Sequence, residues 1–219
     1  MGWTGILVPE NYGGSDLGYL TFGVILEQLG RQLCASPLFA SAYVGASAIN
    51  MGGNDDQKQR WLPGIVDGSE ILTFAVDEQP RHQRDAIASK ASASDGGFLL
   101  NGAKTFVPEG MSATTFVVAA KTDAGDIELF LVPANADGVS RTQMDTVDKR
   151  DHARVTLTNV ALPTEAHLAG MPSGELYEQV LNRACAGVAM EMLGVGCFSF
   201  EMVCERDGDE ISNDESSWC

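Results

Sequence analysis

Side chains that could bind a metal or act as nucleophiles are few and scattered in this sequence. The three histidines (His82, His152 and His167) have no carboxylate or cysteine at the spacing of a ligand set. The serines of Ser15-Asp16 and Ser36-Pro37 are typical of a helix cap and a turn rather than of nucleophilic machinery. The five cysteines also lack metal-ligand spacing. We therefore expect no metal site.

The charge balance argues against another class of function. The chain has 219 residues, of which 14 are basic and 30 acidic, so its formal net charge is −16. Binding to nucleic acid requires clustered lysine and arginine, and adsorption to an anionic membrane also requires positive charge. Acidic residues crowd the last twenty positions, which indicates a solvated surface with a charged tail.

The cysteines and the apolar runs bear on location. An odd number of cysteines in mostly apolar helical text favours reduced thiols in the cytosol over a disulfide framework. No basic start is followed by an apolar stretch, so we expect no secretion signal. The longest apolar run, Cys185 to Phe200, contains Glu191 and three glycines, and we expect it to be too short and interrupted to span a membrane. These features predict a cytoplasmic protein.

The hydrophobic pattern of residues 1–70 predicts helices. Ser15 or Asp16 can cap a helix whose apolar residues recur every three or four positions. A second helix, over about residues 38–52, is rich in alanine and other small residues, so we expect it to be buried. Asn54 and Gln57 have the spacing of a capping box and predict the start of a third helix.

From about residue 71 the pattern changes to short strands separated by Gly, Asp and Pro, at the spacing of an antiparallel sandwich or barrel. Asn101-Gly102 lies between two apolar runs, and this pair predicts a tight β-hairpin turn. The second run stops at Val107-Pro108, because proline cannot donate a hydrogen bond to a neighbouring strand. The expected strands are 71–76, 86–93, 98–101, 104–107, 115–121, 128–132, 139–143 and 154–160.

A helical pattern returns at Leu176 and continues to about Val203, and beyond Asp207 we expect an acidic disordered tail without periodicity. The order is helical, β, helical, with neither the alternation of a Rossmann sheet nor a G-x-G-x-x-G motif. The predicted fold class is therefore α+β and multidomain. Its parts are an N-terminal helical domain (1–70), an antiparallel β-barrel or sandwich as the middle domain (71–172), and the start of a C-terminal helical domain (173–219).

Several stretches, taken in order, resemble the acyl-CoA dehydrogenases, flavin enzymes that oxidise acyl-CoA thioesters. G2-W-T-G-I-L-V-P-E-N-Y-G-G14 resembles the opening motif of the family, and F74-A-V-D-E78 stands where the family has its flavin-binding strand. L99-L-N-G-A-K-T-F106 resembles the hairpin of the family. The resemblance extends from residue 2 to about residue 203. It implies that the C-terminal part is the first helix of a truncated four-helix bundle.

The resemblance implies an acyl-CoA substrate, FAD between the middle domain and the bundle, and an electron-transfer flavoprotein or similar acceptor. It also implies subunits that pair in a homo- or hetero-oligomer. In the family a bundle glutamate removes the α-proton while the β-hydrogen leaves as hydride to flavin N5. No residue here matches that base, so we assign no catalytic residue. By resemblance, the cofactor-binding residues are Phe74, Ala75, Val76, Asp77, Phe106, Val107 and Pro108.

Three departures from the family pattern bear on activity. The family's Gly-Ser-Asp loop is replaced by Q79-P-R-H-Q-R-D85, which forms either an exposed polar loop, as we favour, or contacts from Arg81, His82 and Arg84 to CoA phosphates. Pro108 stands where the family has a Ser or Thr whose hydroxyl contacts the isoalloxazine. After Glu205 the sequence no longer follows the bundle pattern.

The sequence therefore supports a fragment of an FAD-dependent acyl-CoA dehydrogenase that we expect to be inactive alone. The alternative is a non-catalytic assembly subunit of a heteromeric acyl-CoA dehydrogenase with a degenerate flavin site. The missing loop and Pro108 favour this alternative. A third hypothesis is a related flavoprotein that uses the same fold for oxidation with O₂ or for monooxygenation.

Overall fold

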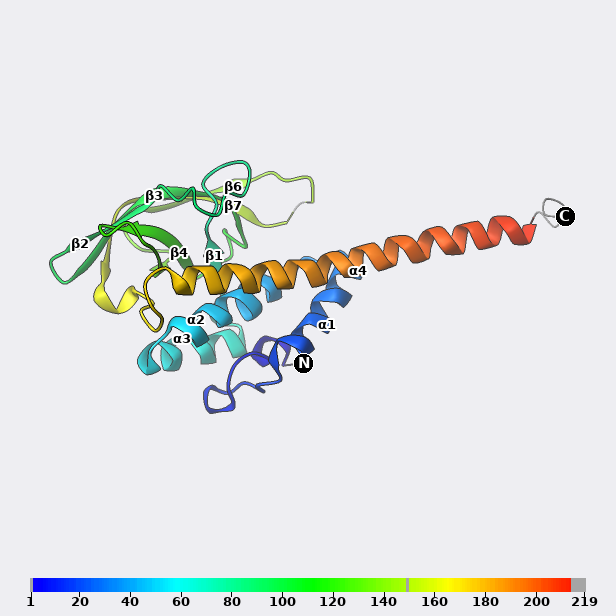
Figure 1. The fold of residues 1–219 in the computed structure, drawn as a ribbon, viewed down its shortest axis with the longest axis horizontal. Coiled ribbons are helices and arrows are strands. Elements are labelled where there is room, and N and C mark those ends of the chain that lie inside the picture. Colours follow the sequence, from blue (N-terminus) through cyan, green and yellow to red (C-terminus); the bar gives the residue numbers. More distant parts are fainter. Residues whose placement is uncertain (1, 149, 214–219) are drawn as a thin grey trace.

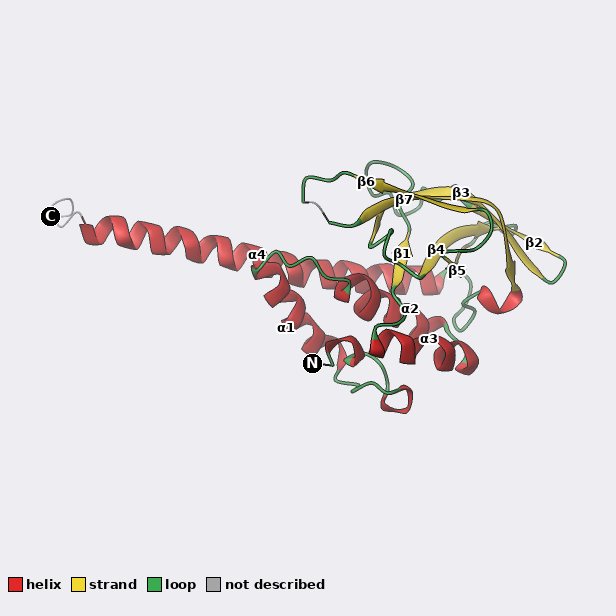
Figure 2. Cartoon of the chain, turned by 180° about the vertical axis from the view of Figure 1, so that it is seen from behind, coloured by secondary structure: helices red, strands yellow, loops and turns green. Residues whose placement is uncertain are grey.

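The computed structural model describes residues 2–148 and 150–213, with side chains as far as Glu205. A group of helices and a curled β-sheet lie on opposite sides of the long helix α4 (Glu175–Asn213), which runs between them and then projects away from both (Figure 1). The view from behind shows the strands gathered on one side of α4 and helices α1–α3 on the other (Figure 2). The predicted fold class, with a helical, a β and a second helical part, is confirmed.

The N-terminal helices are short and connected by tight turns. Two 3₁₀ turns open the chain, and a π-helical segment, Leu38–Gly45, leads directly into α2. The α-helices are α1 (Gly18–Arg31), α2 (Ala46–Gly52) and α3 (Asp55–Asp67). The second predicted helix therefore exists over its expected length, although its first half has π-helical hydrogen bonding.

The capping box at the start of α3 is confirmed. Asn54 Oδ1 accepts a hydrogen bond from Gln57 N, and Gln57 Oε1 accepts one from Asn54 N, both at 2.8 Å. The cap predicted for α1 is wrong, because the N-cap residue is Leu17 and no side chain caps the helix. The backbone amides of Ser15 and Asp16 instead donate to carbonyls in the opening loop, which fixes both residues there.

The seven strands form one mixed sheet in the order β1–β4–β2–β3–β7–β6, with β5 paired to β4. β1 and β2 run parallel to β4, and the remaining pairs are antiparallel, so the spacing of the strands alone gave an incomplete description of the sheet. The strands are β1 (Leu72–Ala75), β2 (Lys90–Ser94), β3 (Gly97–Pro108), β4 (Thr115–Thr122), β5 (Ile127–Pro133), β6 (Val139–Met144) and β7 (His152–Pro163).

The hairpin turn predicted at Asn101-Gly102 is wrong. β3 runs through this pair without a break and pairs with β7 on both sides of it, with a register shift between Leu100 and Gly102. Asn101 Oδ1 accepts a hydrogen bond from Asn159 N at 2.8 Å, so the pair forms a β-bulge that joins the two strands. The hairpin turn lies instead at Asp95-Gly96, between β2 and β3, where Gly96 has a φ of 85°.

Central strand β4 is buried on both faces and connects two hydrophobic cores. Val117 and Ala119 belong to the core shared with the N-terminal helices. Phe116, Val118 and Ala120 belong to the core enclosed by the curled sheet. All five side chains have no exposed surface, and this explains why the strand is an uninterrupted apolar run without polar alternation.

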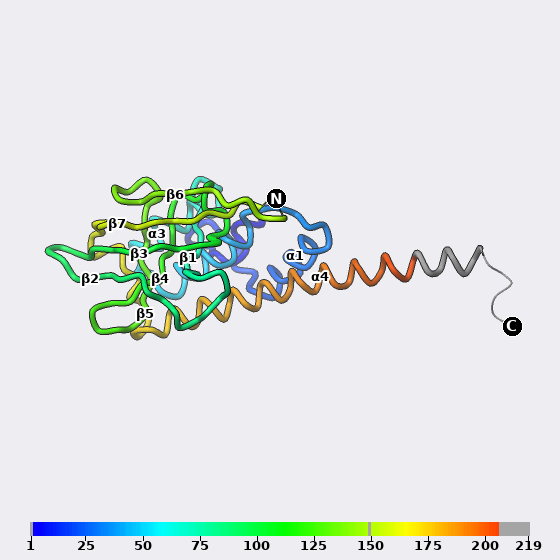
Figure 3. The backbone as a smooth tube through the Cα atoms, turned by 90° about the horizontal axis from the view of Figure 1, so that it is seen from above, coloured from blue at the N-terminus to red at the C-terminus, as the bar shows by residue number. Residues whose placement is uncertain are grey.

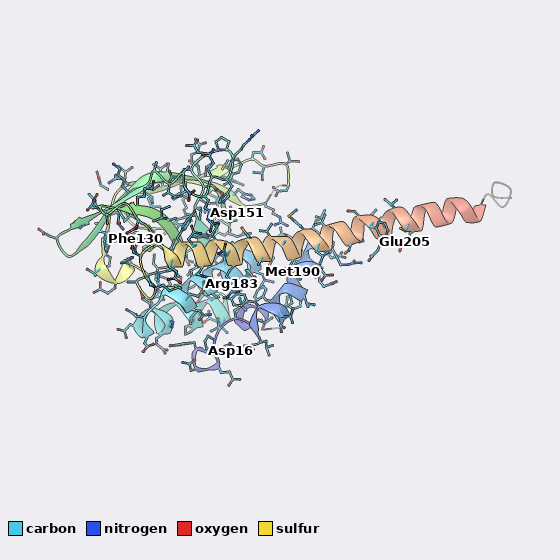
Figure 4. All side chains as sticks on the ribbon, viewed as in Figure 1. Asp16, Phe130, Asp151, Arg183, Met190 and Glu205 are labelled. Carbon is cyan, nitrogen blue, oxygen red and sulfur yellow. The ribbon has the colours of Figure 1, made fainter. Side chains whose placement is uncertain are left out.

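Glycines allow α4 to approach α1 closely. A Cβ on Gly30 of α1 would overlap the carbonyl oxygen of Glu191, and a Cβ on Gly194 of α4 would overlap that of Glu27. Arg183 and Met190 lie on the part of α4 that passes over the helices, and Glu205 lies on the part that projects beyond them (Figure 4). Seen from above, the projecting part extends past α1 and away from the sheet (Figure 3).

The described part of α4 also meets the length and composition criteria for a membrane-spanning helix. Its most apolar window of 18 residues, within Glu175–Glu205, has a mean hydropathy of 1.4 and is 11% buried. Core helices of soluble proteins meet the same criteria, so the expectation that this run does not span a membrane stays a prediction. Ion pairs of Glu191 with Arg150 and of Glu201 with Arg31 nevertheless tie α4 to the rest of the chain. Its exposed large apolar side chains are Val188, Met192, Leu193, Val195, Phe198, Phe200, Met202 and Val203.

α4 ends later than the sequence predicted. The helix was expected to end near Val203 but continues to Asn213, because no proline interrupts it and an internal glycine costs only about 1 kcal/mol relative to alanine. The part of the predicted disordered tail over residues 207–213 is therefore helical. Residues 214–219 of the predicted tail lie outside the described residues.

A pair of substitutions on α4 tests the glycine contact. Gly196 has no atom within 4 Å of an added Cβ, so Gly196→Ala should raise the free energy of unfolding by about 0.5–1 kcal/mol through helix propensity. Gly194→Ala should lower it by about 1–3 kcal/mol, because the added carbon meets backbone. Urea unfolding followed by circular dichroism measures both, and equal shifts for the two variants would contradict the close approach of α1 and α4.

Candidate functional site

A cavity of about 510 Å³ lies between the sheet and α4, and most of its wall is apolar. The π-helical segment contributes Phe39, Ala40 and Val44. The lining residues of α4 are spaced three or four positions apart, so they lie on one face of the helix. Its members are Leu181, Ala184, Cys185, Val188, Ala189 and Met192.

The structure brings five of the seven predicted cofactor-binding residues to this cavity. Phe74, Val76, Asp77, Phe106 and Pro108 all line it. The other two do not: Ala75 is fully buried and Val107 is 1% exposed, and both side chains point into the core of the curled sheet. Alternation along an extended chain explains this separation, since neighbouring side chains point to opposite faces. That the five residues contact a flavin stays a prediction.

A second bulge in β3 turns Phe106 toward the cavity. The pairing of β3 with β7 shifts register between Lys104 and Val107, and Phe106 has a φ of 51°. Positive φ is uncommon for a bulky residue, and it persists only where the surroundings hold it. Here the Phe106 amide faces Met144 Sδ at 3.3 Å, and Thr105 N donates to the Asp77 carbonyl at 2.7 Å. The bulge therefore directs the Phe106 ring toward the cavity, whereas regular pairing of β3 with β7 would have turned it to the other face of the sheet.

A buried ion pair fixes the strand end beside the cavity. Lys104 Nζ has no exposed surface and donates to Glu78 Oε1 at 2.7 Å and to the Val76 carbonyl at 3.1 Å. The Glu78 carboxylate also accepts hydrogen bonds from the amides of Ala88 and Ser89, at 2.6 and 3.0 Å. The sequence analysis did not assign Lys104 a role, although a lysine inside an apolar strand is a signal that could have identified it.

Burial acts in opposite directions on the pKa values of the two members of this pair. Burial lowers the pKa of Lys104, and the Glu78 carboxylate only partly opposes this effect. For Glu78, burial acts to raise the pKa, but the hydrogen bonds from Lys104 and Ser89 outweigh it and hold the pKa below its usual value. Glu78 is therefore the ionised anchor of the pair.

The segment 79–87, which replaces the family loop, is tied to α4. Arg84 forms an ion pair with Glu178, and the Tyr177 hydroxyl donates to the Arg84 carbonyl at 2.6 Å. Burial raises the pKa of Tyr177 to about 12. His82 Nδ1 lies 2.7 Å from Asp77 Oδ1. Arg84 and His82 thus already have acidic partners, which disfavours the alternative in which they bind CoA phosphates.

The expectation of no metal site stays a prediction. Among residues 2–148 and 150–205, no group of three His, Cys, Asp or Glu side chains stands close enough together to hold a metal ion.

Comparisons with protein-family models agree with the fold. Models of the acyl-CoA dehydrogenase N-terminal domain and middle domain match residues 1–69 and 75–160, which together make up most of the chain. The chain belongs to the acyl-CoA dehydrogenase family.

Relatives within the acyl-CoA dehydrogenase family are longer than this chain. Acyl-CoA dehydrogenase FadE12 of Mycobacterium tuberculosis is 32% identical over 175 residues, which cover 76% of this chain and 45% of the relative. The mitochondrial 2-methylacyl-CoA dehydrogenase of Solanum tuberosum is 35% identical over 175 residues, which cover 74% and 42%. The chain thus spans about half the length of the curated relatives it matches.

Solved structures of longer chains share the fold. The ChsE4–ChsE5 complex from Mycobacterium tuberculosis matches with a TM-score of 0.85 and 27% identity, over 93% of this chain and 54% of that chain. A glutaryl-CoA dehydrogenase from Mycobacterium smegmatis in complex with FADH₂ matches with a TM-score of 0.83 and 25% identity, over 91% and 53%.

The cavity fits the ring system of the flavin that acyl-CoA dehydrogenases use. Phe74, Val76, Phe106 and Pro108 face the aliphatic wall of α4, and an apolar, aromatic lining suits a flat isoalloxazine. In segment 79–87, two of the three basic residues, Arg84 and His82, are paired with acidic side chains, so the segment offers little free positive charge to a diphosphate. The residues of this chain would therefore hold the ring rather than the diphosphate.

Lys104→Met tests the buried ion pair. Removing the lysine leaves the Glu78 carboxylate buried without its cation, so the free energy of unfolding should fall by about 3–5 kcal/mol. Adding Glu78→Gln removes the stranded charge and should restore part of the loss. Urea unfolding at neutral pH measures this double-mutant cycle. Additive losses in the double variant would show that the two side chains are not coupled.

Proposed function

We propose that this chain carries one wall of the flavin site of an FAD-dependent acyl-CoA dehydrogenase, which performs α,β-dehydrogenation of an acyl-CoA thioester. The observation that carries the proposal is the cavity between the sheet and α4, where five residues assigned to the cofactor by resemblance meet. The acceptor that we propose is an electron-transfer flavoprotein or a similar protein, and the location that we propose is the cytoplasm.

The residues of the chain supply the shape of the site and an apolar lining. Phe106, set by its bulge, and Phe74 offer aromatic surface from the sheet, while α4 closes the opposite side. When bound, FAD supplies the hydride acceptor for the β-hydrogen. A water-poor site strengthens the electrostatic interactions that stabilise charge developing on the thioester carbonyl. The Lys104–Glu78 pair keeps the strand end that bears Val76 and Asp77 in place.

Flavin binding by this cavity can be tested by filling it. Ala189 lines the cavity from α4, so Ala189→Trp should weaken FAD binding at least about tenfold, which corresponds to about 1.4 kcal/mol. Ala186→Trp, on an exposed turn of the same helix that does not line the cavity, is the matched control and should bind as the unmodified chain does. Quenching of flavin fluorescence in a titration measures both variants. Equal affinities would place FAD elsewhere.

A non-catalytic assembly subunit of a heteromeric acyl-CoA dehydrogenase is the second candidate. It is supported by the missing family loop, by Pro108, which departs from the family pattern at the cavity, and by the exposed apolar side chains of α4. The ChsE4–ChsE5 complex among the solved relatives is a heteromeric precedent. Chain that stays colourless and takes up no FAD even in excess would favour this candidate, and a yellow chain with flavin absorbance would remove its main support.

We expect the chain alone, supplied with FAD, to give no reduction of an electron acceptor by an acyl-CoA. The reason is that one long helix closes the cavity and its outer apolar face is uncovered, so that side of the site stays open to water. Bleaching of a dye acceptor with butanoyl-CoA is the measurement. Bleaching above the rate without protein would contradict this expectation.

A further inference from the structure

The cavity contains a histidine–aspartate pair that the family pattern does not account for. Among the described residues that line the cavity, Asp77 is the only carboxylate and His82 the only imidazole, and the two side chains contact one another. His82 lies in the segment that stands where the family has its Gly-Ser-Asp loop.

The contact with Asp77 decides which nitrogen of His82 is available to a ligand. Nδ1 of His82 lies 2.7 Å from Asp77 Oδ1. A carboxylate without its proton can only accept a hydrogen bond, so in that state Nδ1 is the donor, and the lone pair of a neutral imidazole resides on Nε2. No hydrogen bond joins Nε2 to a residue in the described part of the chain, so this nitrogen is the one that a ligand in the cavity can meet.

Both members of the pair are held from several sides. The Asp77 carbonyl accepts a hydrogen bond from Thr105 N on β3, which fixes the backbone of Asp77 beside the second bulge. The segment that carries His82 is anchored before it by Glu78, which bonds Lys104, and after it by Arg84, which pairs with Glu178 on α4. The imidazole is therefore oriented by a braced loop rather than by Asp77 alone.

We propose that His82 is a proton-accepting base for the α-carbon of an acyl thioester bound in the cavity, and that Asp77 is the positioning residue that sets its tautomer. The proposal rests on the proposed function for the ligand class. In the step, the α-carbon–hydrogen bond breaks, the proton moves to Nε2, and the electron pair delocalises into the thioester carbonyl. Reversal returns a proton to the α-carbon, so this step alone consumes no oxidant.

The exposure of the pair suits proton exchange with water. The side chain of His82 is 49% exposed and that of Asp77 is 31% exposed, although both line an otherwise apolar cavity. One edge of the imidazole therefore faces the ligand space while solvent can remove or replace the transferred proton. A positioned general base of this kind typically accelerates proton transfer about 10²–10⁴-fold.

Phenylacetyl-CoA in D₂O separates this step from oxidation. Its acyl group has hydrogens on the α-carbon and none on the β-carbon, so dehydrogenation cannot occur and only α-exchange remains. The full chain with excess FAD should incorporate deuterium faster than buffer, as measured by mass spectrometry. His82→Gln should reduce the exchange rate by about 10²–10⁴-fold without weakening binding, which calorimetry measures. Gln83→Ala, an exposed neighbour outside the cavity, is the control and should exchange at the original rate.

Asp77→Asn gives a readout that loss of structure would not produce. In ¹⁵N spectra of the full chain, the proton of His82 should reside on Nδ1, and Asp77→Asn should shift it toward Nε2 while circular dichroism stays unchanged. Exchange should fall with it. Binding of phenylacetyl-CoA without exchange, or exchange retained in His82→Gln, would overturn the assignment of His82. Failure of any acyl-CoA to bind would overturn the proposed function and this inference together.

Discussion

The arrangement around the cavity depends on the buried ion pair between Lys104 and Glu78. Lysine and glutamate are costly to remove from water, and such a pair is tolerated only when further hydrogen bonds satisfy both groups. Here the Val76 carbonyl accepts a further hydrogen bond from the lysine, and the amides of Ala88 and Ser89 donate hydrogen bonds to the glutamate. Three segments that are distant in sequence therefore meet at one point. Because the pair joins the end of β1, the approach to β2 and the middle of β3, these segments cannot shift independently. The cavity wall that they form is held rigid as a result.

The two bulges of β3 show how backbone irregularity shapes the site. The first, at Asn101-Gly102, brings the strand so close to Ser89 that an added Cβ on Gly102 would overlap its side chain, so only glycine fits. The second rotates Phe106 toward the cavity. Pro108 then ends the strand, and its carbonyl accepts a hydrogen bond from the Thr73 hydroxyl at 2.5 Å. A proline that replaces a hydroxyl-bearing residue of the family thus still connects β3 to β1, through its backbone.

The sequence predicted what short-range physics determines and missed what distant contacts decide. Asn54 and Gln57 form their capping box because both partners lie within one turn of helix. Asn101-Gly102 and Asp95-Gly96 have the same local preference for a tight turn, and only pairing with β7 selects the second. Five of the seven residues named by resemblance line one cavity, but Lys104 and the His82–Asp77 contact depend on side chains that converge across the fold. The hydrophobic periodicity of a sequence does not show which distant side chains will come into contact.

One helix links the cavity to the outer surface. Val188 and Met192 of α4 line the cavity and are also 40% and 67% exposed, so the same turns of helix face the ligand space and the solvent. Contact with α1 through Gly30 and Gly194 sets the position of this helix from the other side. A molecule that covers the exposed face raises the affinity of the cavity for its ligand when it favours the position of α4 that the ligand binds best. Ligand binding then favours that association by the same free energy, so binding in the cavity and covering of the exposed face of α4 are coupled.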